Sequence, residues 1–186
     1  MIEEFASDFF AGVREAMAEV QLRDVRCVVQ ALEQAYRDGN TVFIMGNGGS
    51  AASASHLACD LSYAEGKRNR FRVVCLTDSV PLLTALSNDL GYEEVFGSQL
   101  EQLLGAGDVM IVLSVSGDSK NIVQAAQVAR RHDAVSIGFL GSKGGRMQDL
   151  LDHCVTMSSS DFPVVESAHC VLMQMVASAF RRCIAE

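Results

Sequence analysis

The sequence predicts an α/β protein whose helices cover both faces of a doubly wound, five-stranded parallel sheet. Short apolar segments of strand length alternate along the chain with longer segments of helical periodicity, the pattern of such folds. A glycine-rich turn follows the first apolar segment, at residues 46–50, and a serine-rich turn follows the third, at residues 114–119. Ligands bind beyond the carboxyl ends of the strands in these sheets, so both turns are candidate binding loops.

The predicted strands are short, and the first of them is an apolar run containing Val and Ile, which suits a parallel strand covered on both faces. The five strands span residues 42–45, 72–76, 109–113, 134–140 and 154–157. Helices are predicted directly after the glycine turn and over residues 80–88, 93–104, 123–130 and 164–184.

Two amphipathic helices precede the sheet. Apolar residues recur at helical spacing over residues 2–20 and again over 22–38, which predicts an N-terminal helical hairpin within residues 1–38. We expect the whole chain, residues 1–186, to form a single domain. The apolar side chains of the first helix, Phe5 and Phe9 among them, suit either a subunit interface or the cover of one sheet face, and the sequence leaves both open.

Composition limits the classes of function. The net charge of −8 over 186 residues argues against a general nucleic-acid surface, although local N–H groups can still bind a small anion. No apolar run approaches ~20 residues, so no transmembrane helix is expected, and residues 1–4 do not begin a signal peptide. The six cysteines contain no CxxC pair, which predicts reduced thiols in a cytoplasmic protein.

The glycine turn reads Gly46-Asn47-Gly48-Gly49-Ser50. Its glycines allow positive φ and bring backbone N–H groups close to a ligand, and Ser50 is a candidate N-cap for the helix that follows. Such a turn at a helix N-terminus can bind an anion. The alternative is an ordinary turn between a strand and a capped helix.

The serine turn reads Ser114-Val115-Ser116-Gly117-Asp118-Ser119. It holds more hydroxyls than capping requires, which favours a phosphate site, although a serine cap with polar turn residues is the simpler alternative. A third glycine-containing turn, at residues 140–146, is expected only to connect two elements.

Together with Asn88-Asp89 and the segment around Glu166 and His169, these motifs resemble the sugar isomerase (SIS) domain family, and within it the phosphoheptose isomerase group. The resemblance implies a homotetramer with active sites at subunit interfaces. It also implies conversion of sedoheptulose 7-phosphate to a heptose 7-phosphate. No organic cofactor is expected, and composition and charge already argue against a membrane or nucleic-acid partner. Substrate contacts are then expected at Asn47, Gly48, Gly49, Ser50, Asn88, Asp89, Ser114, Val115, Ser116, Ser119 and Gln174.

The chain departs from this group at its catalytic centre. The family carries His-x-x-x-Glu on the helix after the glycine loop, where this chain has His56 and Asp60. On the last helix the family has Gln and, eight residues later, His, where this chain has Glu166 and Gln174. The resemblance makes these four residues candidate ligands of a zinc ion, which some members bind, and makes Asp60, Glu166 and His56 the candidate catalytic residues.

Aldose–ketose isomerisation moves a proton between adjacent carbons through an enediol, so it needs a base and stabilisation of developing negative charge. Asp60 shares a helix face with His56 and could be a base, could orient His56 or could bind a metal. Glu166 follows an apolar segment that suits a proton shuttle, or it is a first-turn glutamate favoured by the helix dipole. Because the serine loop is intact, we predict an isomerase of this or a related phosphosugar. The alternative is a non-catalytic phosphosugar-binding protein resembling a replication-initiation regulator of the same family.

Overall fold

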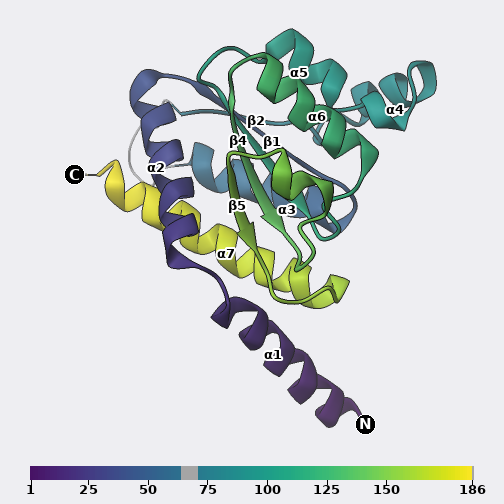
Figure 1. Ribbon diagram of the computed structural model, residues 1–186, viewed down its shortest axis with the longest axis vertical. Helices are drawn as coiled ribbons and strands as arrows, with labels where there is room; N and C mark the ends of the chain where they lie inside the picture. Colours follow the sequence, from purple (N-terminus) through teal and green to yellow (C-terminus); the bar gives the residue numbers. More distant parts are fainter. Residues whose placement is uncertain (64–70, 186) are drawn as a thin grey trace.

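The computed structural model describes residues 1–63 and 71–185, and its core is a five-stranded sheet (Figure 1). The strands are β1 (Thr41–Gly46), β2 (Arg72–Cys75), β3 (Val109–Ser114), β4 (Val135–Leu140) and β5 (His153–Thr156). All neighbouring strands are parallel, in the order β2-β1-β3-β4-β5. The predicted five-stranded parallel sheet is confirmed, with strand ends shifted by at most one residue.

Helices cover both faces, as the doubly wound prediction requires. On one face α2 (Leu22–Asp38), α3 (Gly49–Ser62) and α7 (Phe162–Cys183) pack on one apolar cluster, and on the other α5 (Gly97–Leu103) and α6 (Lys120–Arg131) pack on a second. The helix predicted over residues 93–104 is divided into the single turn η1 (Tyr92–Glu94) and α5. Val95 and Phe96, between them, are fully buried, so the chain turns there to place both side chains in the core.

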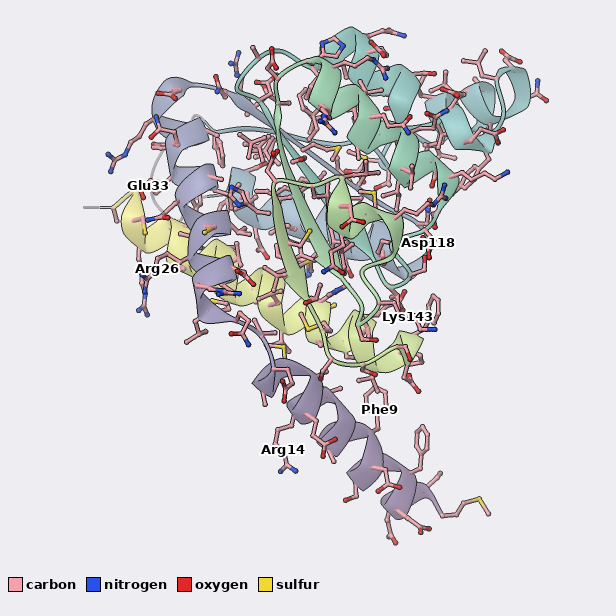
Figure 2. The ribbon with its side chains drawn as sticks, in the orientation of Figure 1. Phe9, Arg14, Arg26, Glu33, Asp118 and Lys143 are labelled. Carbon is pink, nitrogen blue, oxygen red and sulfur yellow. The ribbon has the colours of Figure 1, made fainter. Side chains whose placement is uncertain are left out.

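The two N-terminal helices form as predicted, α1 over Ile2–Ala18 and then α2. Both contact α7, and α1 extends away from the sheet and its helices (Figure 1). Phe9 points from α1 toward the start of α7 (Figure 2) and packs on the core, whereas Phe5 and Phe10 are 68% and 71% exposed. Part of the apolar surface of α1 is therefore uncovered in one chain.

The terminal helix α7 is the longest element, at 22 residues. By length and composition it is apolar enough to cross a membrane, a property that the core helices of soluble proteins share. One stripe of α7, including Val165, Leu172 and Phe180, is fully buried within the apolar cluster it shares with α2 and α3. This burial accounts for the apolar composition of the helix.

The strand order places the two candidate loops at the switch point of the sheet. β2 lies on one side of β1, and β3 lies on the other. The connection after β1 therefore leads toward one edge of the sheet, and the connection after β3 leads toward the other. Gly46 pairs with Leu113 in this register, so Asn47 and Ser114 follow side by side. The prediction that both loops share one edge of the sheet is confirmed.

Candidate functional site

The glycine turn leads directly from β1 into α3. Gly48, with φ +57°, is the N-cap, and the helix begins at Gly49. The prediction that Ser50 caps the helix is wrong: Ser50 lies one residue inside the helix and is buried. A Cβ at Gly46 would lie 2.6 Å from the Ser50 carbonyl oxygen, so a glycine there allows the strand and the helix start to approach closely.

The serine loop closes on itself around the start of α6. Ser114 Oγ accepts a hydrogen bond from the Gly117 N–H at 3.0 Å, and Ser116 Oγ accepts one from the Asp118 N–H at 3.3 Å. Ser119 is the N-cap of α6. A cavity of about 70 Å³ lies between the two loops, lined by Asn47, Ser50, Leu113, Ser114, Val115, Ser116, Ser119, Phe162 and Glu166. Whole-ligand pockets are several times larger, so this cavity suits one substituent of a ligand, such as a phosphate group.

The third turn does more than connect β4 to β5, contrary to expectation. Gly117, with φ +66°, lies so close to it that a Cβ there would be 2.0 Å from the Gly144 carbonyl oxygen. The Arg146 N–H donates to the Asp118 carboxylate at 2.9 Å, and the Arg146 guanidinium donates to the Asp118 carbonyl at 2.6 Å. Asp118 and Lys143, one from each turn, lie at the same side of the molecule (Figure 2). The third turn therefore buttresses the serine loop.

Glu166 extends from α7 into the same cavity. A Cβ at Gly49 would lie 2.5 Å and 2.6 Å from the two carboxylate oxygens of Glu166, so Gly49 leaves the space that this carboxylate occupies. The carboxylate thus lies at the N-terminus of α3, where the helix dipole favours a negative charge. A single small cavity brings together the predicted phosphate loop and one of the predicted catalytic residues.

The other predicted catalytic residues lie further along the same pair of helices. A line of contacts joins α3 to α7: Gly49 faces Glu166, Ser53 Oγ is 3.6 Å from Cys170 Sγ, and His56 and Asp60 face Gln174. Because the residue numbers rise together along both helices, α3 and α7 run parallel. We call this line of contacts the α3–α7 seam. From Gly49 to Asp60 the helix rises ~16 Å, so Glu166 is well separated from the group around Asp60.

Three of the four positions of the family's catalytic centre meet at the far end of the seam, namely the retained His56 and the substituted Asp60 and Gln174. Gln174 Nε2 donates a short hydrogen bond to Asp60 Oδ2 and lies 3.1 Å from His56 Nε2, and His56 Nε2 is 3.4 Å from Asp60 Oδ2. The amide nitrogen of Gln174 must face Asp60. If the amide oxygen faced Asp60 instead, two acceptor oxygens would meet with no hydrogen between them. His56 is half exposed at its side chain, and the Asp60 side chain is 19% exposed.

These residues do not fit a zinc site. Glu166 lies at the other end of the seam, and Gln174 turns its nitrogen, which cannot ligate a metal, toward His56 and Asp60. Within the described ranges there is no group of three or more His, Cys, Asp and Glu side chains that could hold a metal ion. Structural and catalytic zinc sites take at least three such protein ligands.

Asn47 lies between the small cavity and a second, more open one of about 410 Å³. The second cavity is lined by Asn47, Tyr92, Glu93, Ser119, Lys120 and Asn121. Asn47 hydrogen-bonds to both Asn121 and Tyr92, two residues that sequence analysis did not single out. Asn121 follows the serine motif by two residues and is buried, and this proximity to the motif is the one signal that could have pointed to it.

Asn88 and Asp89, predicted to contact substrate, lie elsewhere in this chain. Both are exposed at the end of α4 (Val80–Asp89), where Asn88 Nδ2 donates to Asp89 Oδ1 at 2.8 Å. They line neither of the two cavities around Asn47. A role for them in substrate binding stays a prediction.

His169 is fully buried on α7, three residues after Glu166. One ring nitrogen hydrogen-bonds the backbone at Leu140, the last residue of β4, and within the described ranges Nε2 has no partner. Burial lowers the pKa of His169 from 6.5 to about 4, against a smaller opposite effect of the bond to Leu140. This histidine is therefore neutral at pH 7 and supports the backbone behind the serine loop.

Comparisons with known proteins point to one family. The family model described as "SIS domain" matches residues 8–141. A phosphoheptose isomerase of Pelobacter propionicus is 35% identical over 176 residues, which cover 92% of this chain and 93% of that protein. Phosphoheptose isomerase 2 of Campylobacter jejuni is 37% identical, over 78% of this chain and 73% of that protein. A solved phosphoheptose isomerase from Neisseria gonorrhoeae has a TM-score of 0.90 at 26% identity, and covers 97% of this chain and 98% of its own.

Proposed function

The chain belongs to the SIS domain family and to its phosphoheptose isomerase group, and on that premise we propose that it is a phosphosugar aldose–ketose isomerase. The substrate we propose is sedoheptulose 7-phosphate and the product D-glycero-D-manno-heptose 7-phosphate. The observation that carries this proposal is the small cavity, because it combines a serine loop suited to phosphate with the carboxylate of Glu166. A cavity that only bound a phosphate would gain nothing from a carboxylate in its wall.

In the proposed binding mode the three serine hydroxyls and the N-terminus of α6 hold the phosphate. Ser114, Ser116 and Ser119 can each donate a hydrogen bond to a phosphate oxygen, while the lone pairs of Ser114 and Ser116 accept from the loop. The start of α6 adds the favourable end of a helix dipole. Substrate contacts at Gly48, Gly49, Ser50 and Val115 are proposed on the same basis, because these residues form or adjoin the two loops.

Glu166 is the proposed proton carrier. As a carboxylate it takes the proton from the carbon next to the substrate carbonyl, and it returns that proton to the former carbonyl carbon after the enediol has formed. The amino end of α3 and the amide of Asn47 then stabilise the negative charge that develops on the enediol oxygens. A catalytic role for Asp60 and His56, which Gln174 holds further along the seam, stays a prediction, because this group is well separated from Glu166.

We propose that this chemistry proceeds without zinc, because Gln174 presents a nitrogen to His56 and Asp60. The purified protein should hold no stoichiometric zinc by elemental analysis, and titration calorimetry with zinc should show no tight site. Gln174→His, which restores the family residue, should gain zinc affinity. Tight zinc binding by the unmodified protein that Gln174→Ala removes would contradict the proposal.

The test of the function is incubation of the protein with sedoheptulose 7-phosphate and analysis of the product. Glu166→Gln keeps the size of the side chain and restores the family residue, yet it cannot carry a proton. We expect turnover to fall by about 10²–10⁴-fold while phosphosugar affinity is retained, because Glu166 acts on the proton and not on the phosphate. Unchanged turnover in Glu166→Gln would exclude Glu166 as the proton carrier.

The uncovered apolar surface of α1 supports a further part of the proposal, that the protein is a homotetramer, and we propose that it is cytoplasmic as its family resemblance suggests. Ile2, Phe5 and Phe10 are more than 65% exposed, and a second copy would bury them. Phe5→Ser together with Phe10→Ser should lower the mass measured by sedimentation, whereas Glu4→Gln on the same helix should not. A stable monomer of the unmodified chain at micromolar concentration would contradict the assembly.

A further inference from the structure

The side chain of Asn47 is held by two other residues on the ligand side of the sheet. Its Oδ1 accepts a hydrogen bond from the Tyr92 hydroxyl at 2.8 Å and another from Asn121 Nδ2 at 2.9 Å. Its Nδ2 donates to Asn121 Oδ1 at 3.0 Å. The two amides therefore form a reciprocal pair, and Tyr92 adds a third hydrogen bond to one of them.

A backbone group fixes the direction of this pair. The Ile122 N–H lies 2.9 Å from Asn121 Oδ1, in addition to its 3.1 Å hydrogen bond to the Ser119 carbonyl. Exchanging nitrogen and oxygen in both amides would keep the reciprocal pair. It would, however, turn Asn121 Nδ2 toward the Ile122 N–H, and two donors cannot form a hydrogen bond. Asn121 must therefore keep its oxygen toward Ile122, which sets Asn47 and makes the Tyr92 hydroxyl the donor.

The hydrogen-bonding capacity of Asn47 is thereby restricted to one kind of contact. Tyr92 and Asn121 occupy both lone pairs of its Oδ1, and Asn121 takes one of its two N–H groups. The remaining N–H is the one hydrogen bond that the side chain can offer to a ligand. The small cavity that Asn47 lines is otherwise provided with serine hydroxyls, which can also donate.

We propose that Tyr92 is a positioning residue that, together with Asn121, holds Asn47 as a hydrogen-bond donor directed at an acceptor oxygen of the bound phosphosugar. This proposal rests on the proposed function and adds to it the polarity of one substrate contact. The acceptor is a phosphate oxygen or the carbonyl oxygen of the sugar. Without the Tyr92 hydroxyl, one lone pair of Asn47 Oδ1 is free and Asn121 alone holds the amide, so its remaining N–H is held less firmly toward the ligand.

A double-mutant cycle on Tyr92 and Asn47 tests this proposal. Tyr92→Phe removes the hydroxyl and keeps the ring of a side chain that is already 54% exposed, so the fold should be unaffected. We expect the Kd for sedoheptulose 7-phosphate to rise about 3- to 10-fold, the effect of one lost neutral hydrogen bond, and kcat to fall as well if the acceptor is the carbonyl oxygen, where negative charge develops. In an Asn47→Ala background the same change should have no further effect, because Tyr92 acts only through Asn47. Tyr63→Phe, at another exposed tyrosine, is the matched control and should bind like the unmodified protein.

The outcomes separate this proposal from the proposed function. Equal effects of Tyr92→Phe with and without Asn47 would overturn the positioning role, and so would unchanged binding by Tyr92→Phe alone. Binding of sedoheptulose 7-phosphate without its conversion would count against the isomerase, while the cycle could still be completed by calorimetry and would decide the role of Tyr92. Failure of the unmodified protein to bind either this sugar or inorganic phosphate would overturn both proposals.

Discussion

Gln174 on α7 donates a hydrogen bond from its side-chain amide to the carboxylate of Asp60 on α3. The same amide nitrogen lies beside the His56 ring, so one neutral side chain holds two titratable ones at the end of the α3–α7 seam. A histidine at position 174 would instead be able to share a metal ion with them.

This contact should contribute measurably to stability. Gln174→Met keeps the length of the side chain but removes the donor from a carboxylate that is mostly buried. We expect the free energy of unfolding in urea to fall by about 1–2 kcal/mol, since a hydrogen bond to a charged group is lost but some solvent reaches Asp60. Gln127→Met, at an exposed glutamine of α6, should change it little. Equal effects of the two substitutions would show that the Gln174 contact is not stabilising.

The serine loop should determine phosphosugar affinity. Ser116→Ala removes one hydroxyl donor from the proposed phosphate and should cost about 1–3 kcal/mol of binding free energy, measured by calorimetry with sedoheptulose 7-phosphate. The triple alanine variant at Ser114, Ser116 and Ser119 should bind much more weakly still. Ser178→Ala, on the exposed side of α7, is a suitable control. Undiminished binding by the triple variant would place the phosphate elsewhere.

Gly117→Ala should be far more damaging than the same change at another left-handed glycine. Both Gly117 and Gly39 have positive φ, so alanine costs about 1–2 kcal/mol at either position. At Gly39 nothing lies within 4 Å of an added Cβ, whereas at Gly117 it would collide with the Gly144 carbonyl oxygen. We expect Gly117→Ala to lose about 1–3 kcal/mol more unfolding free energy than Gly39→Ala. A similar loss at both sites would contradict close packing of the third turn on the serine loop.

His169 should make the protein less stable in mild acid. Its pKa is lowered from 6.5 to about 4 in the folded protein, so between these values the unfolded chain takes up a proton that the folded chain does not. The free energy of unfolding should therefore decrease as the pH falls below 6.5, by about 2 kcal/mol from this group by pH 5, until the loss is complete below pH 4.

His169→Asn provides the control for that pH dependence. The asparagine amide can still hydrogen-bond the backbone at Leu140, but it does not titrate. Urea unfolding at pH 7.5 and pH 5 should show a smaller difference in this variant than in the unmodified protein. An equal difference in the two proteins would assign the acid sensitivity to other groups.

The sheet and its binding edge could be predicted because their signals are local. The strand β3 is a short run of apolar residues, and the three serines around Gly117 mark the binding loop that follows it. The switch point then follows from the alternation of helices and strands. One detail of this prediction was wrong. Ser50 has the side chain of a typical N-cap, but α3 already begins at Gly49 and its N-cap is Gly48.

The arrangement within the site could not be predicted in the same way. Nothing near Glu166 in the sequence indicates that its carboxylate lies against Gly49, because that contact depends on how α3 and α7 pack across the whole domain. Gln174 and Asp60 meet for the same reason. Tyr92 reaches Asn47 through a turn that begins at Gly91, with φ +98°, and a single tyrosine in a connecting segment carries no pattern of its own.

The parallel packing of α3 and α7 also fixes when the site can form during protein synthesis. α7 begins at Phe162, 100 residues after α3 ends at Ser62, so α3 has long left the ribosome before its partner is translated. The glycine turn and the serine loop are also translated before α7, but a domain generally folds as a unit, so the site is complete only once α7 has emerged. Glu166 and Gln174 are translated last, so a nascent chain that already has the strands β1 to β5 still lacks the proposed proton carrier and the side chain that holds His56 and Asp60.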